Sequence, residues 1–580
     1  MSEKLNLLAN LLEIRGESAF RVGAYRRAAE GITRLSEPLE GIRRRGELQS
    51  IPGVGGSIAR KIEELLDTGT MARLEEVERE VPSGVAALLA VPDIGPKRAR
   101  LLWEDAGVED LDALRGALEE GRVDELLGPG EARRISEGLE SLRGGEENRL
   151  PLGVARGMAL DLIPRLRKVA PSIEHIEPAG SVRRFRETVG DLDIAAASEE
   201  PESVVEAFAA LRGVSRIELK GPARCRVILE ERGFPADLWV LPNRHWGSLL
   251  FHVTGDKYHD IKVRELAVAR GGRLNEYGYT ENESLTPFGA EEEVYEFFGM
   301  QYVPVPMRSD SGEVELALRG ELPRVLTLED LKGDLHAHTD WSDGSRSVLE
   351  MALAAKERGH EYLAITDHSR GLGVANGLDA RRLRAQREEV DEVNEELAPF
   401  RVLQGVELEV RADGSLDLPD DILAELDIVI AAIHTGLRQG RGKLTARALS
   451  AVRHPLVDVL AHPTGRIVGG REGGDFDLEA LYREAAKTGT VLELDGDPGR
   501  MDLRDVHAQA AVDAGCTLSV DSDAHSTEGL GNLFFGVGVA QRAWVPPEKV
   551  INALPLEGML AGLKRNEGSS GVTQRGSRVR

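Results

Sequence analysis

Cysteine is scarce in this chain, since only Cys225 and Cys516 occur among 580 residues, and they lie far apart. They form neither a metal-binding pair nor a redox pair, so we expect both to serve packing. No run of 18 apolar residues exists, which excludes a membrane-spanning helix. The N-terminus, MSEKLNLLANLLEIRG, is amphipathic and lacks the basic start and apolar stretch of a signal peptide. We therefore expect a cytoplasmic protein without membrane association.

Positive charge is also in deficit. The 73 Lys and Arg residues are outnumbered by 99 Asp and Glu residues, giving a formal net charge of −26. This balance argues against diffuse attraction to nucleic acid, but backbone amides at helix N-termini can still bind phosphate locally. The chain needs several domains, since single cores rarely grow beyond about 250–300 residues. Residues 566–580 are small, polar and basic; we expect a disordered tail, with weak DNA contact as the alternative.

Metal-ligand chemistry, in contrast, is abundant in the last 250 residues, where seven apolar runs end in a candidate ligand. Helix-like segments lie between several of these runs. This alternation predicts a parallel sheet closed into a barrel, in which chemistry gathers at the C-terminal ends of the strands. The candidate ligands are His336, His338, Asp343, His368, Glu407, His434, His462, Asp523 and His525.

Imidazole and carboxylate ligands without thiolates suit zinc or manganese, and a bridging carboxylate can hold two ions for hydrolysis of phosphate esters. These residues resemble the polymerase-and-histidinol-phosphatase (PHP) phosphoesterases across residues 334–565. The resemblance implies up to three ions, Mn²⁺ or Zn²⁺. One position would use His336, His338, Glu407 and Asp523; the second Glu407, His434 and His462; the third Asp343, His368 and His525.

Two segments of the N-terminal third share one pattern, residues 50–62 (SIPGVGGSIARKI) and 90–102 (AVPDIGPKRARLL). Each has an apolar residue and Pro, then a turn ending in Gly, then a helix. The pattern resembles the helix–hairpin–helix motif. We expect Gly53, Gly55 and Gly95 to allow a tight turn with positive φ and close backbone approach, so that the next helix binds a DNA phosphate. For a single copy, a simple helix-joining turn is the alternative.

A basic helical face, Arg21, Arg26 and Arg27, precedes the first hairpin and is either solvated or a pocket for a DNA 5′ phosphate. This region resembles the small N-terminal domain of family X DNA polymerases. In that family a lysine after the first hairpin can form a Schiff base with an abasic sugar, and Lys61 occupies the matching position. Because Ser57 replaces a phosphate-binding lysine of the eukaryotic repair member, lyase activity of Lys61 is a hypothesis.

Three acids of the middle third suit a pair of metal ions. Asp191 and Asp193 stand two apart in the apolar run DLDIAAA, so on a strand both carboxylates face one side. Asp237, in FPADLWVL, lies on a strand of similar character. Two Mg²⁺ or Mn²⁺ ions held there would suit nucleotidyl transfer from a triphosphate to a primer 3′-OH.

The turn before these acids, GSVRRFRETVG, begins with Gly180 and Ser181, whose backbone and hydroxyl can meet phosphate, and Arg183 and Arg184 supply charge there. The whole string resembles the nucleotidyltransferase palm of family X polymerases. Carried over, the resemblance implies that Asp191, Asp193 and Asp237 are catalytic metal ligands. It also implies that the incoming triphosphate is bound by Gly180, Ser181, Arg184 and Gly190.

Residues 252–279 resemble the thumb of the same family but depart from it at four positions. His252-Val253 replaces Tyr-Phe, Asp256 replaces Ser, and Asp260 replaces Asn. Two acids near a triphosphate pocket repel it unless a metal ion or an arginine compensates. Changed nucleotide preference, weakened synthesis and a palm kept only for DNA binding all stay open.

The order of motifs resembles bacterial family X DNA polymerases with a C-terminal PHP domain. We expect a multidomain fold: α-helical helix–hairpin–helix domains, an α+β nucleotidyltransferase palm and thumb, and a distorted TIM-like (β/α)7 PHP barrel. The expected ranges are 1–85 for the lyase-like domain, 86–148 for the fingers, 149–242 for the palm, 243–316 for the thumb, 317–333 for a linker and 334–565 for the barrel, before the tail at 566–580.

The implied function is base-excision-type DNA repair: template-directed gap filling with dNTPs, together with a 3′–5′ exonuclease or 3′-phosphoesterase in the barrel. Gapped or primer–template DNA is the expected partner, and the protein is expected to be a monomer. Two alternatives remain. The chain is either chiefly a DNA-directed phosphoesterase with a weakened palm, or a DNA-bound scaffold in which the metals serve structure.

Overall fold

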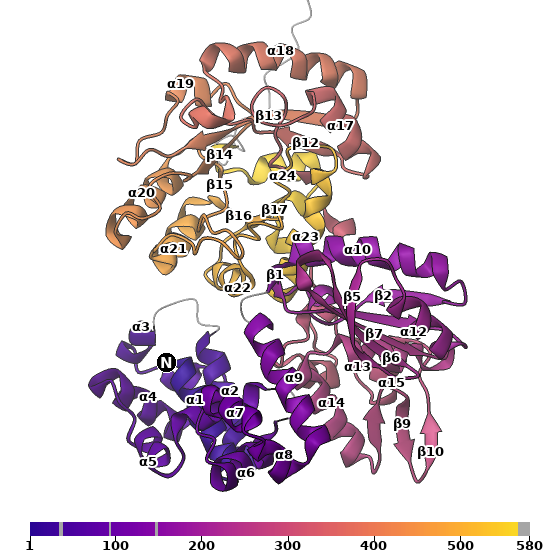
Figure 1. The fold of residues 1–580 in the computed structure, drawn as a ribbon. Coiled ribbons are helices and arrows are strands. Elements are labelled where there is room, and N and C mark those ends of the chain that lie inside the picture. Colours follow the sequence, from indigo (N-terminus) through magenta and orange to yellow (C-terminus); the bar gives the residue numbers. More distant parts are fainter. Residues whose placement is uncertain (34–38, 92–93, 146–148, 567–580) are drawn as a thin grey trace, which may run out of the picture. The chain divides into compact units, whose positions relative to one another are not determined.

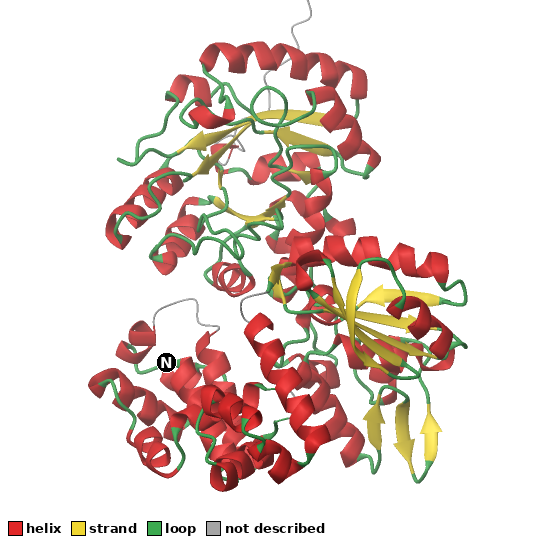
Figure 2. Cartoon of the chain, in the orientation of Figure 1, coloured by secondary structure: helices red, strands yellow, loops and turns green. Residues whose placement is uncertain are grey.

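The computed structural model describes residues 1–33, 39–91, 94–145 and 149–566 (Figures 1 and 2). The chain divides between Asn148 and Arg149 into two compact units, each with its own hydrophobic core. In the described part of the chain, no helix is both long and apolar enough to cross a membrane.

The first unit is helical, as Figure 2 shows in red. Its elements are α1 (Ser2–Ile14), α2 (Ala19–Thr33), α3 (Leu39–Arg44), η1 (Leu48–Ser50), α4 (Gly56–Thr68), α5 (Ala72–Glu80), η2 (Ser83–Ala90), α6 (Pro96–Ala106), α7 (Leu111–Glu119), α8 (Arg122–Leu127) and α9 (Pro129–Gly145). Helix α4 shows why they pack. Ile58, Ile62 and Leu65 recur at helical spacing on its buried face, and Gly69 ends the helix in the left-handed region (φ 74°).

The palm in the second unit is a five-stranded sheet in the order β2-β4-β7-β6-β5. Its strands are β2 (His175–Pro178), β4 (Leu192–Ala197), β5 (Val214–Lys220), β6 (Arg224–Leu229) and β7 (Pro235–Leu241), and β1 (Leu150–Pro151) pairs with β3 (Thr188–Val189). Alternate residues of β4 serve opposite faces. Ile194 and Ala196 pack in the core that includes α10 (Leu152–Val169) and α12 (Pro201–Ala209); Ala195 and Ala197 pack against α13 (Trp246–Thr254).

The thumb combines α13 and α14 (Lys257–Ala269) with a small antiparallel sheet and further helices. These are β8 (Arg273–Asn275), β9 (Gly278–Glu281), β10 (Ser284–Thr286), α15 (Glu291–Phe297) and α16 (Glu313–Arg319). A buried charge pair lies in its core: the Arg308 guanidinium is fully buried and donates to Glu291 Oε1 at 2.6 Å. Residues 292–317, which read as aromatic and then proline-rich, pack into this core through Val294, Tyr295 and Met307.

The barrel begins at Gly333. Its seven strands are all parallel and neighbour one another in sequence order: β11 (Gly333–Asp334), β12 (Tyr362–Ile365), β13 (Arg401–Glu409), β14 (Ile428–Ala432), β15 (Val459–Leu460), β16 (Val491–Asp495) and β17 (Leu518–Asp521). The helices between the strands are α17 (Val348–Glu357), α18 (Ala380–Leu397), α19 (Asp420–Leu423), α20 (Arg441–Arg453), α21 (Leu478–Thr488) and α22 (Asp505–Asp513), and α23 (Leu533–Arg542) and α24 (Leu556–Gly562) follow β17.

The first and last strands meet beyond their regular ends. Ala337 forms a parallel bridge with Ala524, and the His338 amide donates to the Ala524 carbonyl at 2.8 Å. This short seam closes the sheet and carries candidate ligands on both sides. The predicted fold class, helical N-terminal domains followed by a palm, a thumb and a distorted (β/α)7 barrel, is confirmed.

The palm and the barrel share one continuous core within the second unit. Phe185, which follows α11 (Gly180–Arg183) in the left-handed region, places its ring 4.7 Å from that of Phe534 on α23. Next to this contact, Glu187 pairs with Arg466 at 2.7 Å. The turn before the palm acids is therefore built directly onto the barrel.

Candidate active sites

All nine predicted barrel ligands lie at the C-terminal ends of the strands. His336 and His338 follow β11, and Asp343 lies in the loop after them. His368 follows β12, Glu407 lies within β13, His434 follows β14 and His462 follows β15, while Asp523 and His525 follow β17. The parallel strands bring their ends to one side of the barrel, so residues nearly 190 positions apart share a site.

Glu407 lies at the centre of this cluster and is about 1 % exposed. Its Oε1 lies 2.8 Å from His462 Nε2 and 3.1 Å from His434 Nε2. Its Oε2 lies 2.7 Å from His368 Nδ1 and 3.6 Å from His336 Nε2. One carboxylate with imidazoles on both oxygens is the geometry expected of a bridging metal ligand.

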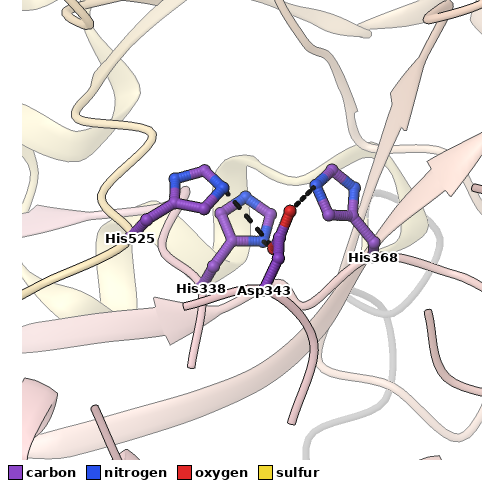
Figure 3. Close-up of side chains that lie close together, drawn as sticks. All are labelled: His338, Asp343, His368 and His525. Carbon is purple, nitrogen blue, oxygen red and sulfur yellow. Dashed lines mark ion pairs between the residues drawn. The ribbon is translucent and has the colours of Figure 1, made fainter. Parts of the chain in front are cut away.

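The third predicted set lies together as well. Figure 3 shows Asp343 between the rings of His368 and His525, with His338 alongside. Asp343 Oδ2 lies 3.4 Å from His368 Nε2, and Asp343 Oδ1 lies 3.5 Å from His525 Nε2. The sets are less separate than the resemblance implies, because His338 falls close enough to serve two of them and His368 also joins Glu407 and His434.

Unsatisfied polar atoms indicate what this site is built to hold. The buried atoms without a hydrogen-bond partner include His336 Nε2, His338 Nδ1 and His462 Nδ1, and His368 Nδ1, His434 Nε2 and Glu407 Oε2 have only the ion-pair contacts given above. Burying one such atom without a partner costs about 1–3 kcal/mol of folding free energy. A group of them in one cavity therefore lowers the stability of the metal-free protein. Divalent cations would satisfy these atoms, and the nitrogen and oxygen donor set fits Mn²⁺ or Zn²⁺.

The surroundings shift the pKa values of the cluster histidines in opposite directions. Burial alone would lower the pKa of His368, yet Glu407 and Asp343 raise it to about 10. Burial likewise opposes the charge on His434, but Glu407 raises its pKa to about 9. Burial dominates at His338 and lowers its pKa to about 3, which leaves a neutral imidazole of the kind that binds metals.

Two carboxylates that sequence reasoning missed orient these imidazoles. Glu493 Oε1 lies 2.6 Å from His336 Nδ1, and its Oε2 accepts from the His462 amide. Glu409 Oε2 lies 2.8 Å from His434 Nδ1. Such contacts fix the tautomer and turn Nε2 toward a metal. Both acids lie on barrel strands, in the runs VLELDGDP and VELEV. Their alternation with apolar residues is the sequence feature from which a position facing the site could have been predicted.

The palm holds a second cluster. Asp193 on β4 stands directly opposite Asp237 on the parallel strand β7, and Asp191 precedes β4. Ligand atoms of the three acids lie within 4.8 Å of one another. Burial and the neighbouring Asp191 and Asp237 raise the pKa of Asp193 to about 8. Three carboxylates crowded in this way are the arrangement that cations relieve.

Two arginines that the sequence did not reveal clamp the third acid. Arg224 donates to Asp237 Oδ1 at 3.0 Å, and Arg226 pairs with Asp237 Oδ2 and, at 3.4 Å, with Asp191 Oδ2. They alternate on β6, whose antiparallel register places Arg226 opposite Asp237. Without a metal ion these guanidinium groups balance part of the negative charge of the palm cluster.

The turn that carries the predicted triphosphate ligands lies against the same acids. Gly180 has φ +54°, and a Cβ there would overlap Asp193 Oδ2, so a glycine is required. Arg184 donates to the Thr254 carbonyl and, at 3.5 Å, to Ser181 Oγ. Gly190 packs against the Arg149 guanidinium.

Arg183, which we expected to supply charge beside Arg184, has its own charge paired within the protein. Its guanidinium donates to both oxygens of Glu291 at 3.0 Å and to Thr254 Oγ1 at 2.9 Å. Arg183 therefore links the palm to the thumb. The sequence could not show this because Glu291 lies more than a hundred residues away.

The acids that depart from the family pattern have partners. Asp256 caps α14 by accepting from the Tyr258 amide at 2.9 Å. Asp260 is 6 % exposed, and burial raises its pKa to about 8 against the opposing charges of Arg264, Arg308 and Arg184. His252 accepts from Arg264 at 2.6 Å and stands edge-on to Trp239. A protonated Asp260 removes one of the two repulsive charges that the sequence suggested.

The hairpin glycines differ from expectation in part. Gly53 has φ +81°, and a Cβ would overlap the backbone of Arg27 and Ala28, as predicted for a tight turn. Positive φ is wrong for Gly55 and Gly95, which have φ −82° and −85° and occupy the N-cap positions of α4 and α6. A Cβ at either would meet nothing within 4 Å. The open space above two helix N-termini still allows close approach of a phosphate.

The remaining N-terminal candidates lie near the first hairpin. Arg21 and Arg26 pair with Glu17 and Glu13, so part of the basic face is neutralised internally. Lys61 Nζ donates to Ser57 Oγ at 3.0 Å. Burial, with Arg60 and Arg73, lowers the pKa of Lys61, which is the direction that favours a nucleophilic amine.

Comparisons with known proteins cover nearly the whole chain. Residues 1–71 match the helix-hairpin-helix domain family, 45–106 the SAM-like helix-hairpin-helix tandem, 249–309 the DNA polymerase beta thumb, and 334–488 the PHP domain. A Bacillus subtilis (strain 168) protein named DNA polymerase/3′-5′ exonuclease PolX is 37 % identical over 568 residues, 97 % of this chain and 98 % of its own. Probable phosphatases of Edwardsiella ictaluri and Syntrophotalea carbinolica are 31 % and 27 % identical, over 38 % of this chain and 90 % of their own lengths.

Proposed function

The chain belongs to the family X DNA polymerases that carry a C-terminal PHP domain, and from that membership we propose how its two clusters divide the chemistry. The palm acids carry template-directed nucleotidyl transfer for gap filling. The barrel cluster carries 3′–5′ exonuclease and 3′-phosphoesterase hydrolysis. One observation supports this division above all: two separate groups of clustered metal-type ligands occur in one chain, each beside features suited to phosphate.

In the palm, Asp191, Asp193 and Asp237 would hold Mg²⁺ or Mn²⁺, ions that when bound lower the pKa of a primer 3′-OH and neutralise a triphosphate. Gly180 and Ser181 offer backbone and hydroxyl donors to the incoming dNTP, and Arg184 and Gly190 complete the proposed pocket. The transferring phosphoryl group is then stabilised mainly by position and electrostatics.

In the barrel, the nine ligands would hold up to three Mn²⁺ or Zn²⁺ ions, which when bound supply Lewis-acid activation of water at the phosphodiester. Glu407 would link the positions, and Glu493 and Glu409 hold the imidazoles of His336 and His434 in the tautomer that presents Nε2. The cavity above the cluster is open and has a volume of about 210 Å³, room for one phosphate and part of one nucleotide.

The helical unit supports binding to gapped or primer–template DNA through the open helix N-termini at Gly55 and Gly95, with Gly53 shaping the first turn. Such contacts hold the backbone without reading sequence. We further propose that Lys61 forms a Schiff base with an abasic sugar. Borohydride trapping on an abasic substrate tests this; an adduct of equal yield from Lys61→Ala would remove the assignment.

A second candidate function is a phosphoesterase with a weakened palm. It is favoured by the arginine clamp on Asp237 and by the His252-Val253 pair in the thumb. Primer extension with Mg²⁺ and with Mn²⁺ separates the two. Incorporation of the templated nucleotide with either ion supports the polymerase; no extension with both, in a preparation that digests 3′ ends, supports the second candidate.

A further inference from the structure

The cavity above the barrel cluster has an apolar side that metal binding does not explain. Its lining combines ligands with Leu372, Val374 and Ala375 and with Arg500. The three apolar residues belong to η7 (Gly373–Ala375) and the residue before it, in the loop after His368. Val374 is 94 % exposed, more than any other large apolar side chain in the described part of the chain. At the edge of this cavity, the exposed Val374 side chain is free to contact a ligand.

The loop is held in place rather than loose. The Leu378 amide donates to the His368 carbonyl at 2.7 Å, and the Arg370 amide donates to the Leu378 carbonyl at 3.0 Å, which closes the loop at its base. Arg382 Nη1 donates to the Asn376 carbonyl at 2.6 Å, and Asn376 Nδ2 donates to the Trp341 carbonyl at 3.3 Å. These bonds hold the turn that projects Val374 into solvent.

Arg500 supplies a cation on the same cavity. Its Nε lies 3.5 Å from Asp495 Oδ2 and 3.5 Å from Asp523 Oδ2, and its side chain is 22 % exposed. Nε is the atom of Arg500 closest to both carboxylates, and among the described residues the Arg500 side chain makes no hydrogen bond. The fork of the guanidinium can therefore bind phosphate oxygens beside the ligands.

We infer that Arg500 and the rim formed by Leu372, Val374 and Ala375 are a subsite for the terminal nucleoside and its phosphate. The inference rests on the proposed exonuclease function and adds residues to it. Arg500 binds a non-bridging oxygen of the scissile phosphodiester, and Leu372 and Val374 pack against the sugar or base. A substrate that is anionic at one end and flat and apolar at the other matches this lining.

The test compares two phosphodiesters of similar reactivity. One is the 4-nitrophenyl ester of thymidine 5′-monophosphate, which carries a nucleoside, and the other is methyl 4-nitrophenyl phosphate, which has the same leaving group but only a methyl group in place of the nucleoside. For the full chain carrying Leu372→Ser with Val374→Ser we expect kcat/KM on the nucleoside ester to fall about tenfold, and on the other ester to change less than about twofold. Arg500→Gln lowers both, and Arg500→Lys restores little because a single ammonium lacks the fork.

Leu353→Ser is the matched control, since Leu353 is also an exposed leucine (40 %) but lies on α17. Metal content after dialysis is measured for every variant, because Arg500 touches Asp523. Equal losses on both esters, or none in the rim variant, would overturn the inference. If the parent cleaves neither ester, the proposed function fails instead. The subsite is then judged by calorimetric binding of thymidine 5′-monophosphate with Mn²⁺, which the rim variant must weaken.

Discussion

At the scale of single residues, sequence reasoning worked best where one strand end supplies one ligand. The barrel histidines and the palm acids each follow or lie within an apolar run. The short sequence around each residue was therefore enough to predict that they lie together at one end of the strands. Arg226, Arg500 and Glu493 could not be assigned in this way, because their roles depend on partners brought together by strand pairing. Arg183 is a further case: its guanidinium pairs with Glu291 of the thumb, more than a hundred residues away.

Glu493 tests the contribution of a carboxylate that does not itself join the ligand set. Glu493→Gln keeps the shape but weakens the acceptor for His336 Nδ1 and the His462 amide. We predict that the affinity of the barrel for Mn²⁺ falls about 10- to 100-fold. Calorimetric titration of metal-free protein measures this, with Glu557→Gln on the exposed face of α24 as the control. Unchanged affinity would show that His336 needs no such support.

Asp260 gives a prediction for pH. Burial raises its pKa to about 8, whereas in the unfolded chain the value is about 4. Between these values the folded state keeps a proton that the unfolded state has lost, so this residue reduces stability as pH rises through the window. Asparagine does not ionise, so in Asp260→Asn this loss of stability at high pH is absent.

The melting temperature of Asp260→Asn should therefore exceed that of the parent by more at about pH 8.5 than at about pH 5. Glu265→Gln, exposed on the same helix, should show no such divergence. A constant difference at both pH values would mean that Asp260 is ionised in the folded protein.

At the scale of elements, the sequence predicted kinds of structure better than local conformation. Strand–helix alternation gave the barrel, and the repeated hairpin pattern placed α4 and α6. Positive φ at Gly55 and Gly95 was wrong because both glycines act as N-caps, where extended backbone suffices. The seam between β11 and β17 was not visible in the sequence, since it depends on a single bridge between residues almost two hundred positions apart.

The contact of α11 with β4 can be tested at Gly180. In Gly180→Ala the new methyl group meets the Asp193 carboxylate and the backbone stays at positive φ, so the turn must move away from the acids. We predict that gap filling falls by about 100-fold while digestion of 3′ ends changes less than about twofold. The control is Gly157→Ala, an exposed position in α10 where a Cβ meets nothing. Equal loss of both activities would count against separate sites.

The packing of α23 against the palm is a second property of elements. The Phe534 ring packs at a tilt against that of Phe185, and its centroid lies 4.0 Å from Arg156 Cζ. We expect Phe534→Ala to lower the free energy of unfolding by about 2 kcal/mol, measured by denaturant titration. Leu554→Ala, exposed elsewhere on the barrel, should cost far less. Comparable losses in both variants would mean that the palm and barrel do not support each other here.

At the scale of the molecule, the second unit joins two sites of different chemistry through one core. The palm cluster consists of carboxylates with arginines around them, whereas the barrel cluster combines imidazoles with acids. This difference explains why the sequence suggested distinct metals for the two halves. The division of labour follows from the placement of these side chains, and the account depends on the two clusters acting separately.

Gap filling and 3′ digestion on one gapped substrate with Mn²⁺, in paired variants, test this most directly. Asp191→Ala with Asp193→Ala should abolish nucleotide incorporation and spare digestion. His336→Ala should abolish digestion and spare incorporation. If both variants keep both activities, or if each loses both, the assignment of one reaction to each cluster is contradicted.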